Sequence, residues 1–261
     1  MKIYKVAIID QTGGKISQAE LSKAMLAMQM QVSRDFARVW NVDVSLSIAA
    51  DSDSMIVGAW PLYIQNNINE PGLAGYHYVD SVGVPYSKVK YSINWTLTAS
   101  HELLEMLVNP YLDRTVRAVS IDGTGENVEY LVEVADPTED GIYGYRIDGV
   151  LVSNFFYPAF YDLFAQKNVQ YDHLGWLTEP RKLLDGGFIS WKNARGVWFQ
   201  GFMAQNRLTV KKLGANSSDL TAAENQTIIY YIIFLAIIGV PLLFWGVVKT
   251  LKTIFYGKLR Y

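Results

Sequence analysis

The sequence has no cysteine and only three histidines in 261 residues. Without cysteine the chain forms no disulfides and offers no thiolate to a metal, so any metal site must use histidine and carboxylate side chains. An excess of one charge is also missing, because 23 Lys and Arg face 25 Asp and Glu. No global basic field is available to attract nucleic acid, and we expect no specific nucleic-acid recognition.

Long hydrophobic runs are scarce as well, with one exception near the C-terminus. Residues 228–248 carry no charge, and about 20 apolar residues are enough to cross a bilayer as a helix. Tyr230, Tyr231 and Trp245 stand near the ends of this run, where aromatic side chains anchor a helix at the membrane interface. We therefore predict a single-pass membrane protein with its lipid contact through residues 228–248.

The remainder of the chain is expected to comprise a globular domain (1–212), a small polar linker (213–227) and, after the span, a basic tail (249–261). The early apolar run of residues 6–9 is too short for a secretory signal. The positive-inside tendency places Tyr261 on the cytoplasmic side, or toward the genome if the membrane belongs to a virion.

Periodicity indicates an α+β domain. Ser17 and Glu20 form a capping-box pattern, and apolar residues then recur at helical spacing as far as Trp40. Alternating or apolar runs separated by turn residues predict strands. The predicted strands are 1–10, 42–48, 60–64, 75–79, 87–93 and 128–135, with hairpins at 143–147/150–153 and 187–192/197–203. We expect a mixed sheet with one long N-terminal helix and a second helix that carries the active site.

That second helix contains the stretch S-H-E-L-L-E-M-L, residues 100–107. His101 and Glu105 are four positions apart, so a helix presents both on one face, one turn apart, where they could share a metal ion. Glu102 occupies the position that holds the general base in the zinc peptidase motif H-E-x-x-H. Glu105 replaces the second histidine of that motif, and a carboxylate is an acceptable zinc ligand.

A three-ligand catalytic zinc needs one more protein group. Asp136 is our first choice, because it ends a predicted strand and its carboxylate projects from a defined turn; Glu139 and His173 follow. The alternative is that these acids form a solvated face and that Asp136 caps a turn. His77 is either a further ligand or a hydrogen-bonded packing residue. The acidic cluster in this region consists of Glu126, Glu129, Glu133, Asp136, Glu139 and Asp140.

Several motifs in the chain resemble those of a family of uncharacterised bacterial and phage proteins that are described as metallopeptidases. They are S-H-E-L-L-E-M-L-V-N-P and Q-V-S-R-D-F-A-R-V-W, together with G-Y-H-Y, V-A-D-P-T-E-D, V-S-N-F and Y-D-H-L-G, within residues 31–175. The resemblance implies a zincin-like domain with a zinc site. The chain departs from the family at Asn109, where relatives often have Asp, and at Ala135, where many have Cys.

Two functions from different classes follow. The first is a membrane-anchored zinc hydrolase acting on a peptide substrate, with His101, Glu105 and Asp136 as ligands and Glu102 as base. The second is a structural membrane protein of a virion, in contact with capsid proteins, that has kept this fold with a vestigial or structural metal site. The intact Glu102 favours the first function; Glu105 in place of histidine, and the phage association of the family, favour the second.

Overall fold

The computed structural model describes residues 1–213. Its first sheet has five strands in the order β2-β1-β3-β5-β4. β1 (Lys2–Gln11) runs parallel to both β2 (Val42–Ala49) and β3 (Trp60–Gln65), and β3 runs parallel to β5 (Pro85–Lys90). β4 (Gly75–Val79) is antiparallel to β5 and forms one edge of the sheet.

The N-terminal helix follows the predicted boundaries but is not uniform. Ser17 accepts a hydrogen bond from the Glu20 backbone N–H at 3.2 Å, which confirms the predicted cap of α1 (Gln18–Met30). A π-helical segment, η1 (Gln31–Phe36), then separates α1 from the short α2 (Ala37–Trp40). The expected single long helix is therefore corrected to a helix with a π-helical interruption, which a pattern of apolar spacing cannot distinguish from a continuous one.

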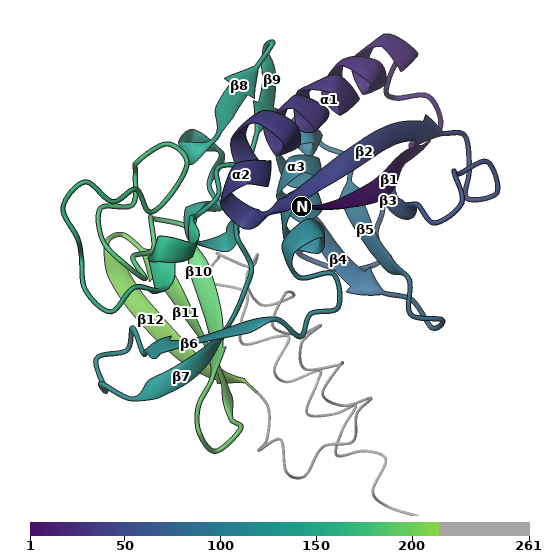
Figure 1. The fold of residues 1–261 in the computed structure, drawn as a ribbon. Coiled ribbons are helices and arrows are strands. Elements are labelled where there is room, and N and C mark those ends of the chain that lie inside the picture. Colours follow the sequence, from purple (N-terminus) through teal and green to yellow (C-terminus); the bar gives the residue numbers. More distant parts are fainter. Residues whose placement is uncertain (214–261) are drawn as a thin grey trace, which may run out of the picture.

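The helix α3 (Trp95–Val108) contains the H-E-x-x-E stretch and ends just before Asn109 and Pro110, as predicted. It packs against β4 and β5 of the first sheet and against β9 (Val150–Val152) (Figure 1). Leu103 and Leu104 are fully buried in this contact. Since replacing a buried leucine by alanine costs about 2–5 kcal/mol, this packing holds the helix firmly in place.

The second sheet has five antiparallel strands in the order β12-β11-β10-β7-β6. Figure 1 shows it beside the first sheet, with its later strands in green. The strand bounds are Thr115–Val119 for β6, Asn127–Leu131 for β7, Phe188–Lys192 for β10, Trp198–Ala204 for β11 and Arg207–Leu213 for β12. Strands β6 and β12 were not predicted, and β12 extends to Leu213, where the linker was expected to begin.

Short elements lie between β7 and β10, two strands of the second sheet. β8 (Tyr145–Ile147) and β9 form the predicted hairpin, and its turn residues Asp148 and Gly149 both have positive φ, at 49° and 83°, as a two-residue type I′ turn requires. Three 3₁₀ helices also lie in this region: η2 (Asp136–Thr138), η3 (Gly141–Tyr143) and η4 (Pro158–Tyr161).

One hydrophobic cluster joins both sheets. It includes Val6 and Leu62 from the first sheet, Leu103 from α3, and Tyr130 and Trp191 from the second sheet. The alternate residues of β1, among them Ala7 and Ile9, belong to a separate cluster on the opposite face. α1 and α3 therefore share one face of the first sheet, and α3 lies where both sheets contribute to the core.

The predicted fold class needs correction. The described residues form a mixed α/β architecture with several sheets, and β1, α1 and β2 make a parallel β-α-β unit of the kind that characterises α/β folds. Within residues 1–213, no helix combines the length and the apolar character needed to cross a membrane. The predicted span at 228–248 and the basic tail lie outside the described residues.

Candidate metal centre

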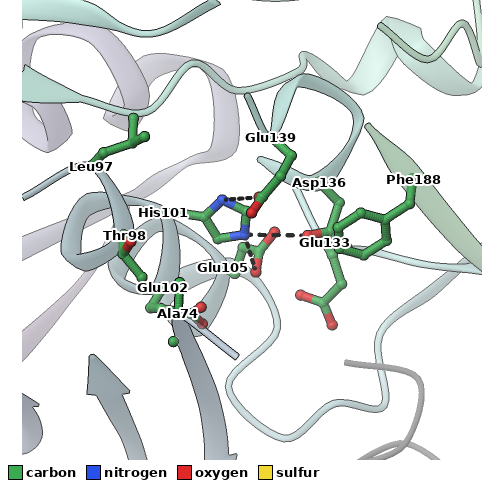
Figure 2. A pocket seen from close by; sticks show the side chains of 11 residues that line it. Ala74, Leu97, Thr98, His101, Glu102, Glu105, Glu133, Asp136, Glu139 and Phe188 are labelled. Carbon is green, nitrogen blue, oxygen red and sulfur yellow. Dashed lines mark ion pairs between the residues drawn. The ribbon is translucent and has the colours of Figure 1, made fainter. Parts of the chain in front are cut away.

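His101 and Glu105 lie on the face of α3 that lines a cavity, and β4 and the segment after β7 form other parts of its wall. His101 Nε2 lies 3.2 Å from Glu105 Oε2, and the same nitrogen lies 3.2 Å from Asp136 Oδ1. Figure 2 shows both carboxylates beside one nitrogen of the His101 ring, and Glu139 beside the other nitrogen. The structure thus brings together the three residues that the sequence placed first as ligands.

Asp136 reaches the cavity because the chain turns immediately before it. β7 ends at Leu131, earlier than predicted, and η2 begins at Asp136 with Pro137 in its first turn. The backbone N–H of Ala135 donates a hydrogen bond of 3.1 Å to Glu105 Oε1. This bond fixes the Glu105 carboxylate and the start of η2 relative to each other.

Glu139 lies behind the His101 ring. Its Oε2 is 3.0 Å from His101 Nδ1, the nitrogen that points away from Glu105 and Asp136. Histidines that bind metals generally donate their second ring N–H to a carboxylate or carbonyl, which fixes the tautomer and the ring orientation. Glu139 is placed to do this for His101, although His101, Asp136 and Glu139 are also close enough together to bind one ion directly.

Glu102 is buried on α3 and lies against Gly75 of β4. A Cβ added to Gly75 would lie 2.8 Å from Glu102 Oε1 and 2.6 Å from Thr98 Cγ2. Only glycine leaves room here for β4 to approach α3 so closely. The position of the Glu102 carboxylate therefore depends on the absence of a side chain at residue 75.

His77 and Glu133 complete the group. His77 Nδ1 is 3.6 Å from Glu102 Oε2 and 3.9 Å from Glu105 Oε2, and its Nε2 is 3.7 Å from Glu133 Oε2. Asn109 donates a 3.2 Å hydrogen bond to the other Glu133 oxygen. Sequence reasoning counted Glu133 only as a member of the acidic cluster, although an acid between Val132 and Val134 in an apolar run was a signal of a buried role.

His173 lies in a different environment. Its ring stacks on Phe155 with centroids 5.1 Å apart, its Nδ1 is 3.4 Å from the Tyr157 hydroxyl, and its Nε2 is 3.7 Å from Asp35 Oδ2. It is not among the residues that line the cavity around His101. The structure therefore brings His77, and not His173, to the group on α3.

The acids of the cavity affect one another's protonation. Burial, reinforced by Glu105, raises the pKa values of Glu133 and Asp136 well above their usual range, and burial also raises that of Glu102. Burial by itself would lower the pKa of His101, but Glu105 and Glu139 raise it well above the usual range. Burial by itself would raise the pKa of Glu105, but His101, His77 and the hydrogen bond from Ala135 together lower it. The cluster favours bound positive charge, as a proton or as a cation.

The buried histidine and carboxylate side chains could hold a metal ion. Ligands at about 2.0–2.2 Å in tetrahedral geometry have donor atoms about 3.3–3.6 Å apart, close to the two 3.2 Å separations at His101 Nε2. The cavity measures about 40 Å³. Since about 10–15 Å³ accommodates one water, an ion and a water fit together. The geometry does not distinguish zinc from other divalent ions.

Comparisons of the chain with protein-family models, with curated proteins and with solved structures found no match. The resemblance drawn from the motifs therefore stays a prediction, and the function has to be argued from the cavity itself.

Proposed function

We propose that this protein is a metal-dependent hydrolase, with zinc as the ion and a peptide bond as the substrate. The observation that carries the proposal is the convergence of His101 Nε2, Glu105 Oε2 and Asp136 Oδ1, with separations of 3.2 Å from the histidine nitrogen to each carboxylate. One nitrogen and two carboxylate ligands leave a fourth position for water or substrate, as in catalytic zinc sites.

A zinc ion held there would supply Lewis-acid chemistry, lowering the pKa of a water and polarising a carbonyl group. The chain supplies the groups around it. Glu102 follows His101 directly in sequence and lines the same cavity; in this proposal its carboxylate takes a proton from the attacking water and passes it to the leaving amine. Glu139 orients the His101 ring through Nδ1.

The walls of the cavity support an extended peptide as substrate. Ala74 and Gly75, at the start of β4, line it on one side, and Leu97 and Phe188 provide apolar surface (Figure 2). β4 is the terminal strand of its sheet among the described residues. An extended peptide can add to such an edge through main-chain hydrogen bonds, which would bring its carbonyl groups past His101 and Glu102.

The test is hydrolysis of a fluorescence-quenched peptide library by the zinc-loaded full chain. Replacing Glu102 by Gln should lower the rate by about 10²–10⁴-fold, because an amide cannot accept the proton, while the ion at His101 stays bound. Glu126→Gln, at an exposed acid outside the cavity, is the matched control and should keep full activity. A wild-type chain that binds zinc but cleaves no peptide would contradict the proposal and favour a structural metal site.

A further inference from the structure

His101, which lines the cavity, and His77, which lies beside three of the cavity's acids, have the same kind of surroundings. His101 faces two carboxylates with Nε2, those of Glu105 and Asp136, and a third with Nδ1, that of Glu139. His77 repeats this arrangement with its nitrogens exchanged: Nδ1 faces Glu102 and Glu105, and Nε2 faces Glu133. Each histidine thus has one nitrogen toward a pair of acids and the other toward a carboxylate that could orient the ring.

The distances around His77 do not correspond to hydrogen bonds. They are 3.6 and 3.9 Å at Nδ1 and 3.7 Å at Nε2, whereas N–H···O bonds measure about 2.7–3.2 Å. Donor atoms that share an ion at about 2.1 Å are separated by about 3–4 Å, depending on the angle between them. The spacing at His77 Nδ1 therefore fits a shared cation better than direct hydrogen bonds.

Burial makes this arrangement costly without a ligand. The His77 side chain is 1% exposed and that of Glu133 is 6% exposed. Among the described residues, neither His77 Nε2 nor Glu133 Oε2 has a hydrogen-bond partner. Buried polar atoms are nearly always satisfied, and an exception requires an explanation such as an ion. A cation at Nδ1 would polarise the ring and draw the Nε2 proton toward Glu133.

The charge of the cavity also favours a bound cation beside His77. Five carboxylates converge on it, and no lysine or arginine is present among the described residues that line it. When all five are ionised, a single divalent cation still leaves three negative charges in a buried site, and buried unpaired charges are strongly unfavourable. A second divalent cation leaves one. The five acids are Glu102, Glu105, Glu133, Asp136 and Glu139.

We infer that a second divalent cation binds beside the cavity, held by His77 Nδ1, Glu102 Oε2 and Glu105 Oε2. Glu105 then bridges the two ions, since its Oε2 faces both histidines. Glu102 binds through the oxygen that faces His77 and keeps Oε1, beside Gly75, for the proton. The inference rests on the proposed function and refines it to a two-ion hydrolase, in which paired ions clamp the attacking and leaving groups.

The test counts ions in the full chain. The protein is stripped with a chelator, loaded with Zn²⁺ or Mn²⁺ alone, desalted and analysed for metal per chain; the Mn²⁺ form is also examined for the exchange-coupled electron paramagnetic resonance signal of an ion pair. Wild type should bind two ions and show the coupled signal. His77→Ala should bind one ion and lose the coupling, whereas the control His173→Ala should retain both.

The wild-type count decides the inference even if His77→Ala fails to fold. One ion per chain in the wild type, without coupling, overturns the second site but leaves the proposed function intact. Two ions retained by folded His77→Ala also overturn it, because the second ion would then lie elsewhere. No bound ion at all would remove both the inference and the proposed function.

Discussion

His101 and His173 both lie beside carboxylates, but the two surroundings differ in how charge is satisfied. Near His173, Asp35 receives hydrogen bonds from Arg34 at 2.6 and 2.8 Å and from the Tyr145 hydroxyl at 2.8 Å. These bonds lower the pKa of Asp35 although burial alone would raise it. Burial lowers the pKa of His173. This is a closed network in which an ion would have nothing further to neutralise.

Around His101 the acids outnumber the bases, and no lysine or arginine lines the cavity within the described residues. The buried Glu133 and Asp136 there have raised pKa values, because of burial and the nearby Glu105. The comparison teaches that a histidine beside an acid is not in itself a metal site. The region around His101 differs in two ways: it has an excess of acidic side chains, and several of their oxygen atoms lie around the same histidine.

The largest expected effect is on metal affinity, and it compares the regions of His101 and His173 directly. His101→Ala should weaken binding of the first ion more than about 100-fold, because even the loss of an orienting carboxylate behind a ligand costs about 10–100-fold. His173→Ala should leave affinity unchanged. Competition with a chromophoric chelator measures both variants. Equal affinities in the two variants would mean that the ion does not use His101.

Glu139 provides a test of intermediate size. Glu139→Ala removes the carboxylate 3.0 Å from His101 Nδ1 and should lower metal affinity by about 10–100-fold while leaving the ion count unchanged. Glu126→Ala, an exposed acid from the same stretch of sequence, should have no effect. A complete loss of the ion from Glu139→Ala would instead identify Glu139 as a direct ligand.

Gly75 tests the close approach of β4 to α3. In Gly75→Ala the new methyl group meets Thr98 and Glu102 at 2.6 and 2.8 Å, so the carboxylate must move, and overpacking costs about 1–3 kcal/mol. Gly201→Ala meets side-chain ends at 3.1–3.2 Å in the second sheet and serves as the control. Both should unfold at lower denaturant concentration, but only Gly75→Ala should impair metal binding and hydrolysis.

The smallest effect concerns the network around His173. Because burial lowers the folded-state pKa of His173 below 6.5, the unfolded chain binds more protons just below that pH, and acidification destabilises the fold. His173→Gln should remove this contribution. The difference in unfolding free energy between wild type and variant should therefore change as pH falls below about 6.5 and stay constant above it. A difference independent of pH would contradict the assignment.

Part of the site could be predicted because it is local. The i, i+4 spacing of His101 and Glu105 on a helix required no tertiary information. Asp136 was chosen because it follows a predicted strand, although β7 ends earlier, at Leu131. His77 and Glu133 join them only through the pairing of β4 with β5 and the path of the chain after β7. Such long-range placement cannot be read from the spacing of residues in the sequence. The role of His77 therefore stayed open between metal ligand and packing residue, and Glu133 was only one of six acids in its cluster.

The fold shows the same limit. Most strands and the cap at Ser17 follow from local patterns, since alternation and turn chemistry act over a few residues. The parallel order of β2, β1, β3 and β5, by contrast, depends on which strands pack together under α1 and α3. The strand β12 was missed because most of its residues are exposed and the adjacent Lys211 and Lys212 break the alternation of apolar and polar residues, so that it resembles a linker.

The most direct test of the metal centre is anomalous diffraction from crystals of the zinc-loaded full chain, collected on both sides of the zinc absorption edge. We predict an anomalous peak about 2.0–2.2 Å from each of His101 Nε2, Glu105 Oε2 and Asp136 Oδ1, with no peak beside His173. A zinc-loaded crystal without a peak in this cavity, or with its only peak between His173 and Asp35, would contradict the account.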